Sequence, residues 1–284
     1  MDGPQPAPFG TLNRIAVTVP DPQATARFLA DGFDFEVRQA GPRLLVVCDG
    51  EYAADGGQGA IELVEGPGHV VERLVFGVPD AVDLDELAAA VDGKRDGDAS
   101  VRVTDPTGIV VSFEPWSLLQ VAAPAPSVLR PRRMGHVNLK SPRPPETAEF
   151  FTGRLHLRLS EYVGEALYWM RTHTEHHTVA LRPGEPSVAH HLGLEIAGWH
   201  AYQPLLDHLG NAGYRAEYGP GRHRPGRSLF TYVVDPSSGL RIELYADMTH
   251  ITDPHAAPIG WEPGDRMTKT LNTWGPTPPE SFLA

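Results

Sequence analysis

Hydrophobic and polar residues alternate along short segments, and these segments recur in the same order in both halves of the chain. The run from Arg14 alternates as a strand does and leads into a proline turn and a helix start, and the run from His136 repeats this pattern 122 residues later. The gapless alignment of residues 14–28 with residues 136–150 pairs five identical residues: Pro20 with Pro142, Pro22 with Pro144, Thr25 with Thr147, Ala26 with Ala148 and Phe28 with Phe150.

Two further segments repeat in register with the first. Residues 73–78 and the helical run after Asp83 resemble residues 191–196 and the helical run from Tyr202. Residues 101–114 match residues 232–245, and each reads as a hairpin with an Asp-Pro turn in which Gly supplies the positive φ. Each half is therefore predicted to contain a strand, a helix and several strands, with a second helix between them.

These repeats divide the chain into two modules and a tail. We expect a first module over residues 10–118, a linker of small residues and prolines from Val121 to Ser127, and a second module over residues 131–248. Residues 249–284 are rich in Pro, Gly and Trp without periodicity, which predicts an ordered tail or lid rather than a domain.

Composition narrows the classes of function. The 29 glycines and 28 prolines are about a fifth of the 284 residues, which fits many turns and short elements. A formal net charge of -12 provides no basic surface for nucleic acid or anionic membranes. The lone cysteine, Cys48, excludes an internal disulfide framework and a cysteine metal cluster. With no apolar run near the roughly 18 residues that span a bilayer and no signal peptide, we expect a soluble, cytoplasmic protein.

Histidine separates the two modules. Where the first module has Arg14 and Arg73, the second has His136 and His191. Aligning Gly108 with Gly239 sets Ser112 opposite Glu243. Two imidazoles and one carboxylate occupy one face of an octahedral divalent ion, usually Fe(II), and leave three adjacent positions for substrate and dioxygen. The second module is therefore predicted to bind a metal through His136, His191 and Glu243.

At these motifs the sequence resembles the type I extradiol ring-cleavage dioxygenases of the vicinal oxygen chelate superfamily, of the catechol and homoprotocatechuate 2,3-dioxygenase kind. The matching motifs are residues 135–138, 189–192 and 241–245, around the three predicted ligands. The resemblance covers both modules and part of the tail. It implies an α+β fold of two tandem modules, each a pair of βαβββ units forming an open barrel, with metal only in the C-terminal module.

The resemblance also implies roles for residues around the metal. His177 matches the acid–base histidine, with His176 as the competing assignment, and it lies on an expected strand over residues 175–181. Residues 219–223 match a loop whose histidine contacts the substrate oxygen. The matched residues are His223 and Tyr232, which are catalytic and contact substrate, and Asn138 and Trp169, which line the substrate pocket. His173, His190 and His200 are interpreted as structural or surface residues.

The implied activity is that of an oxidoreductase of aromatic hydrocarbon catabolism, which opens a catechol ring beside the diol with O2 to give a muconic semialdehyde-type product. Fe(II) is the implied cofactor, with Mn(II) as an alternative, and the family implies a homo-oligomer. Arg266 and Lys269 are the cations of the tail that could meet a substrate carboxylate. The alternatives are another enzyme of the superfamily, such as a glyoxalase-like lyase or isomerase, and a metal-free binding protein of the bleomycin-resistance type.

Overall fold

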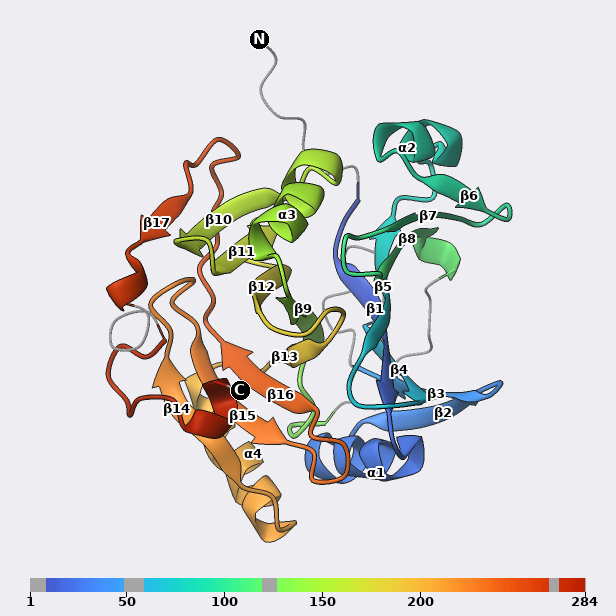
Figure 1. Ribbon diagram of the computed structural model, residues 1–284. Helices are drawn as coiled ribbons and strands as arrows, with labels where there is room; N and C mark the ends of the chain where they lie inside the picture. The colour runs from blue at the N-terminus through green and yellow to red at the C-terminus, as the bar shows by residue number, and fades with distance from the viewer. Residues whose placement is uncertain (1–8, 49–58, 119–126, 266–270, 284) are drawn as a thin grey trace.

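The chain folds into two mixed β-sheets that follow the same strand order (Figure 1). The structure is a computed structural model, and it describes residues 9–48, 59–118, 127–265 and 271–283. The first sheet lies between residues 12 and 115 and the second between residues 133 and 261. The predicted boundaries at residues 10, 118 and 131 fall outside these sheets, whereas the second sheet extends past the predicted boundary at residue 248 through β17 (Ile259–Trp261); the division into modules stays a prediction.

The first sheet is eight-stranded, in the order β2-β3-β4-β1-β5-β8-β7-β6. Its elements, with the short helix η2 that follows them, are β1 (Leu12–Val19), α1 (Pro22–Phe33), β2 (Glu36–Ala40), β3 (Arg43–Val47), β4 (Ala60–Glu65), β5 (Val71–Val78), α2 (Leu84–Ala90), β6 (Lys94–Asp96), β7 (Ser100–Thr104), β8 (Val110–Pro115) and η2 (Trp116–Leu118).

The second sheet repeats this order with one added edge strand, β14-β15-β16-β13-β9-β12-β11-β10-β17. Its elements, with the helical turns of the tail, are β9 (Arg133–Ser141), α3 (Pro144–Glu149), η3 (Phe150–Arg154), β10 (Arg158–Val163), β11 (Leu167–Arg171), β12 (Val179–Pro183), β13 (Ala189–Glu195), α4 (Trp199–Asn211), β14 (Ala216–Arg222), β15 (Leu229–Val234), β16 (Arg241–Ala246), β17 (Ile259–Trp261), η4 (Pro263–Asp265) and α5 (Glu280–Leu283).

Each sheet joins two βαβββ units through their first strands. In both sheets these central strands, β1 with β5 and β9 with β13, run antiparallel. Each central strand also pairs in parallel with the last strand of its own unit, as β9 does with β12 and β13 with β16. The predicted α+β fold of paired βαβββ units is therefore confirmed.

Local sequence explains where the first helix of each module begins. The Asp21 side chain accepts a hydrogen bond from the Ala24 backbone N–H, and Pro22 occupies the first turn, where its missing N–H costs nothing. The repeat places Pro144 at the start of α3, although no side chain caps that helix. The aligned prolines of the two halves therefore mark equivalent helix starts.

The two halves share one continuous apolar core. Buried residues of both sheets form a single cluster, and α1 lies beside α4 at one end of the molecule, where the rings of Phe28 and Tyr214 lie 4.9 Å apart (Figure 1). A buried polar contact crosses the same boundary, since the Thr25 hydroxyl donates to Asp235 Oδ2 at 2.6 Å. The turn that carries Asp235 precedes β16, so this contact helps to fix the strand that bears Glu243.

The tail is more closely integrated into the second sheet than the sequence indicated. β17 pairs in parallel with β10 at the sheet edge, and α5 lies beside β15 and β16 (Figure 1). Because β17 is only three residues long, it leaves no periodic signal in the sequence. No helix among the residues that the structure describes is long and apolar enough to cross a bilayer.

The Thr25–Asp235 contact can be tested by Thr25→Val, which keeps the shape of the side chain and removes the hydroxyl. We expect the free energy of unfolding to fall by about 1.5–3 kcal/mol, because a buried hydrogen bond to a carboxylate is lost. Urea unfolding followed by circular dichroism measures the change. Thr273→Val, at an exposed position, is the control and should change the free energy by less than about 0.5 kcal/mol. Equal stability of the two variants would contradict the assignment.

Candidate active site

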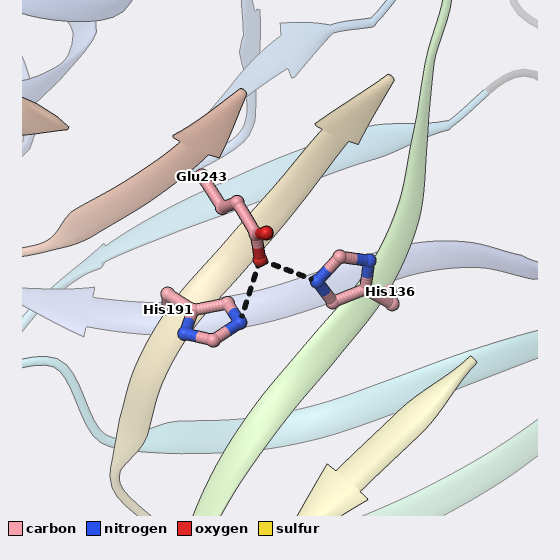
Figure 2. Close-up of side chains that lie close together, drawn as sticks. All are labelled: His136, His191 and Glu243. Carbon is pink, nitrogen blue, oxygen red and sulfur yellow. Dashed lines mark hydrogen bonds and ion pairs between the residues drawn. The ribbon is translucent and has the colours of Figure 1, made fainter. Parts of the chain in front are cut away.

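Two imidazoles and one carboxylate meet in the interior of the second sheet (Figure 2). His136 Nε2 lies 2.9 Å and His191 Nε2 lies 3.0 Å from the same atom, Glu243 Oε2. All three side chains are buried, and their ligand atoms lie within 4.8 Å of one another. Donor atoms held about 2.1 Å from one divalent ion at right angles lie about 3 Å apart. The donor set and its spacing therefore fit a divalent metal ion.

Strand register brings the three side chains together. Gly193 of β13 pairs with His136 of β9 on one side and with Glu243 of β16 on the other. His191 lies two residues before Gly193, so its side chain points to the same face of the sheet. The row across the three strands therefore reads carboxylate, glycine, imidazole.

Gly193 makes room for the His136 ring. A Cβ atom built on Gly193 would lie 2.1 Å from His136 Cε1 and 2.4 Å from both ring nitrogens. The ring also packs against His177 and Tyr245, with centroids 4.4 and 4.9 Å away. Among the described residues nothing hydrogen-bonds to His136 Nδ1, so this ring is held by packing.

Electrostatics favour an ionised carboxylate beside neutral imidazoles. Burial alone would raise the pKa of Glu243, but hydrogen bonds and charge from His136, His191 and His223 together hold it well below its usual range. Burial lowers the pKa of His191 to about 4, although Glu243 opposes the shift. A neutral imidazole keeps a lone pair for a metal, and an ionised carboxylate supplies the charge that a cation requires.

A cavity of about 200 Å³ is lined by His191 and Glu243, and His136 contacts Glu243 next to it. The other sequence-predicted site residues, Asn138, Trp169, His177, His223 and Tyr232, all line it. Asn138 Oδ1 is buried without a hydrogen-bond partner among the described residues, which leaves it available to a bound molecule. The structure therefore brings the predicted metal, acid–base and substrate-binding residues to one cavity.

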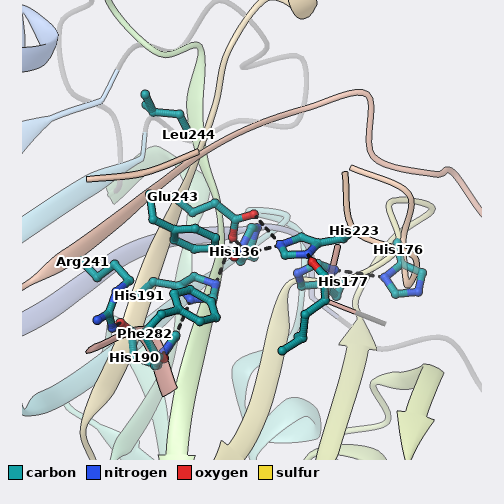
Figure 3. A network of polar contacts seen from close by, with 12 residues as sticks. His136, His176, His177, His190, His191, His223, Arg241, Glu243, Leu244 and Phe282 are labelled. Atoms are coloured by element: carbon teal, nitrogen blue, oxygen red, sulfur yellow. Dashed lines mark hydrogen bonds and ion pairs between the residues drawn. The ribbon is translucent and has the colours of Figure 1, made fainter. Parts of the chain in front are cut away.

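His223 lies beside Glu243 (Figure 3) and pairs with Tyr232. The Leu271 carbonyl can only accept a hydrogen bond, so His223 Nδ1 donates to it at 2.6 Å. His223 Nε2 lies 2.9 Å from the Tyr232 hydroxyl and 3.4 Å from Glu243 Oε1. Burial raises the pKa of Tyr232 well above its ordinary value, and Glu243 adds to the shift. Tyr232 is therefore a neutral hydrogen-bond donor.

The segment around His223 is a strand rather than the expected loop. β14 extends through Arg222, and its pairing with β15 shifts register between Tyr218 and Gly221. Gly219 has a φ of 104°, a conformation that L side chains rarely adopt. This bulge turns the end of the strand, and His223 follows directly at the cavity.

His177 and His176 point in different directions. His177 faces the cavity, and its ring lies against His136. His176 Nδ1 lies 3.1 Å from His177 Nδ1, while its Nε2 lies 3.2 Å from Glu161 Oε1 on the other side. Burial, with the neighbouring His136 and His176, lowers the pKa of His177 well below its ordinary value. This placement favours His177 over His176 for proton transfer in the cavity.

The predicted strand around His177 begins later than expected. β12 starts at Val179, and residues 175–178 are irregular. The backbone N–H of His176 donates to Thr249, and that of Thr178 to Met170, so this segment bonds to two different neighbours instead of one ladder. Hydrophobic alternation in the sequence gives no sign that the backbone hydrogen-bond partner changes within this segment.

The equivalent positions of the first sheet hold an ion-pair cluster. Arg14 and Arg73 both lie within 3.3 Å of the carboxylate of Glu62, which is buried on β4. Glu62 pairs with Ala16, as Ala180 pairs with Asn138 in the second sheet. Within the described ranges, the triad in the second sheet is the sole group of three His, Cys, Asp or Glu placed for a metal ion.

Several cavity residues were not predicted from the sequence. Most are apolar, and two carry polar side chains on strands, Arg182 and His190; the apolar ones are Leu167, Pro183, Pro225, Leu271, Phe282 and Leu283. The adjacent pair His190-His191 was the available signal for His190, which the sequence left as structural. Arg266 and Lys269 lie outside the described residues.

A model of the glyoxalase/bleomycin resistance protein/dioxygenase superfamily matches residues 133–244, the segment that holds the triad. This part of the chain is similar to that superfamily. Metapyrocatechase 2 of Cupriavidus necator is 29% identical over 96% of this chain and 91% of the relative. A manganese-dependent 2,3-dihydroxybiphenyl 1,2-dioxygenase of Geobacillus genomosp. 3 is 29% identical over 52% of this chain and 50% of the relative.

Among solved structures, homoprotocatechuate 2,3-dioxygenase of Arthrobacter globiformis is similar with a TM-score of 0.80. The alignment covers 100% of this chain and 93% of that chain at 21% identity. This likeness shows the shared fold, and it confirms the vicinal oxygen chelate architecture expected from the sequence.

Gly193→Ala tests whether the His136 ring depends on the missing side chain. The added methyl group overlaps the ring, so the ring must rotate away from Glu243, and we expect affinity for Mn(II) to fall by roughly 10- to 100-fold. Metal content after gel filtration, with circular dichroism to check folding, measures the effect. Gly10→Ala, whose Cβ would meet its nearest neighbour at 3.4 Å, is the control. Metal retention equal to that of the control would show that the ring tolerates the methyl group.

Proposed function

We propose that the protein is an extradiol dioxygenase that uses Fe(II), with Mn(II) as the alternative, to open a catechol ring beside the diol with O2. The observation that carries the proposal is the cluster of His136, His191 and Glu243, two of which line a cavity that His177, His223 and Tyr232 also line. The superfamily match and the dioxygenase relatives support the same activity.

His136, His191 and Glu243 would hold the metal ion. When bound, the ion supplies the Lewis acidity and one-electron chemistry that catechol and O2 need in order to react. The chain supplies the orientation around it. Because the three ligands come from one face of the sheet, they leave the cavity side free for the substrate.

The polar side chains of the cavity orient the diol and move protons. The Tyr232 hydroxyl lies beside His223 Nε2 and is placed to hydrogen-bond an oxygen of the diol. His177 also lines the cavity, with its ring against that of His136. A neutral imidazole there can accept the proton of a catechol hydroxyl and return it to an oxygen of the opening ring. The ring-fission product keeps both atoms of O2.

The cavity lining suits an apolar ring. Nearly half of the described lining residues have largely apolar side chains, namely Leu167, Trp169, Pro183, Pro225, Leu271, Phe282 and Leu283. Both terminal nitrogens of Arg182 donate to backbone carbonyls of the tail, at 3.2 and 3.0 Å. We therefore expect catechol and alkylcatechols to be better substrates than 3,4-dihydroxyphenylacetate. An interaction of Arg266 or Lys269 with a carboxylate would reverse that order.

The remaining expectations from the sequence stay predictions. They are a homo-oligomeric assembly, a cytoplasmic location and the absence of nucleic-acid and membrane partners. A charge of -12 supports the last of these, because a basic surface is what phosphate groups require.

Activity is tested with protein loaded anaerobically with Fe(II) or Mn(II) and mixed with catechols in air. We expect one O2 consumed per catechol and a yellow product that absorbs near roughly 375–400 nm, the range of semialdehydes that retain a conjugated enol. Glu243→Ala should lower metal affinity by on the order of 100-fold or more and abolish turnover, since it removes the only anionic ligand. Tight catechol binding without O2 uptake would favour a binding protein, and conversion without O2 a lyase or isomerase.

The role of His177 is tested by His177→Phe, which keeps a ring against His136 but cannot carry a proton. We expect kcat to fall by roughly 10²- to 10⁴-fold, with metal content unchanged. His176→Phe is the matched variant and should cost less, because that ring faces Glu161 rather than the cavity. A larger loss in His176→Phe would assign the proton transfer to His176 instead.

A further inference from the structure

The metal ligand His191 lies at the end of a hydrogen-bond chain that begins in the tail. His191 Nδ1 lies 2.8 Å from His190 Nδ1, and His190 Nε2 lies 2.8 Å from the carbonyl oxygen of Phe282 (Figure 3). His190 is 2% exposed. The two histidines are adjacent in β13, yet both rings are turned so that their Nδ1 atoms meet.

The carbonyl oxygen sets the direction of every hydrogen bond in this chain. A carbonyl accepts and cannot donate, so the proton between His190 and Phe282 belongs to His190 Nε2. In a neutral imidazole the other nitrogen is then an acceptor, and His191 Nδ1 must donate to it. His191 therefore keeps its proton on Nδ1 and directs the Nε2 lone pair at the position between the three ligands.

Helix α5 is fixed in place by charged side chains of the second sheet. Arg182 donates to the carbonyls of Phe282 and Leu283. Arg241 donates to the carbonyl of Ser281 at 3.0 Å and lies over the Phe282 ring, 5.4 Å from its centroid. Arg241 is held in turn by two hydrogen bonds to Glu217. The Phe282 carbonyl is thus a fixed acceptor.

We propose that α5 is part of the metal site, and that the Phe282 carbonyl, acting through His190, selects the His191 tautomer able to bind the ion. His190 is a positioning residue, because it touches neither the metal position nor the bound substrate directly in this role. The inference rests on the proposed function and deepens it. It makes the last turn of the chain, far from the triad in sequence, a determinant of metal affinity.

The other histidine ligand provides a comparison within the same site. His136 Nδ1 has no hydrogen-bond partner among the described residues, and packing against Gly193 sets its ring. Loss of the chain through His190 should therefore loosen His191 and leave His136 in place. We therefore expect loss of the chain through His190 to lower the affinity for the metal ion without abolishing its binding.

The test is Mn(II) affinity, measured by competition with a chelator in the full-length protein without substrate. His190→Phe keeps a flat ring against Phe282 and removes both nitrogens, and we expect Mn(II) affinity to fall by roughly 10- to 100-fold. His190→Asn keeps an acceptor near the position of Nδ1 and should recover part of the loss. Thermal unfolding of the metal-free proteins separates this effect from general destabilisation. Glu280→Ala, at an exposed position of α5, is the control and should bind as the parent does.

A double-mutant cycle tests the link to the tail. Arg182→Met releases the carbonyls of Phe282 and Leu283, and we expect it to weaken Mn(II) binding in the parent but to add little in the His190→Phe background. Additive losses, or His190→Phe affinity equal to that of the parent, would overturn the proposal while leaving the triad intact. If the parent itself bound no Mn(II) or Fe(II), the metal site and this inference would both fail.

Discussion

The structure of the second sheet depends on a carboxylate buried without a basic side chain of its own. Glu243 is 2% exposed, and the groups around it are imidazoles and a phenol rather than lysine or arginine. An ionised carboxylate in such a place is costly unless charge or hydrogen bonds compensate for its lost hydration. Two imidazole nitrogens lie about 3 Å from one carboxylate oxygen, and a divalent cation between them would be bound by all three groups, so the arrangement is suited to a metal ion.

The first sheet has the same strand order, but its buried carboxylate is neutralised by basic side chains. Its buried carboxylate, Glu62, is surrounded by three guanidinium groups, those of Arg14, Arg43 and Arg73, at 2.8–3.3 Å. In the second sheet, Ala180 takes the position of Glu62, so no carboxylate lies there. Leu167 nearby lines the cavity. Val75 occupies the position of Gly193, because Val75 pairs with Ser112 as Gly193 pairs with Glu243. Side chains thus fill the position that the second sheet leaves open for the cavity.

Sequence reasoning succeeded where the information is local or repeated. Alternation and proline turns predicted the two sheets. Comparing Arg14 with His136 and Arg73 with His191 singled out two residues that the structure brings together beside Glu243, although their role as metal ligands stays a prediction. It missed features that depend on a change of hydrogen-bond partner, such as the irregular segment before Val179 and the bulge at Gly219. It also missed backbone groups. The carbonyls of Leu271 and Phe282 could come from any residue type, so no side-chain pattern marks them.

The tail contacts the site at the atoms that the sheet leaves undetermined. Trp261 donates to Glu161, which lies beside His176 and so behind His177. Leu271 and Phe282 accept hydrogen bonds from His223 and His190. Strand register fixes where His136, His190 and His191 lie, but it does not fix which ring nitrogen carries the proton, and the reactivity of histidine depends on that choice. The strands thus position these rings, and backbone carbonyls of the tail accept hydrogen bonds that hold the protons of His190 and His223.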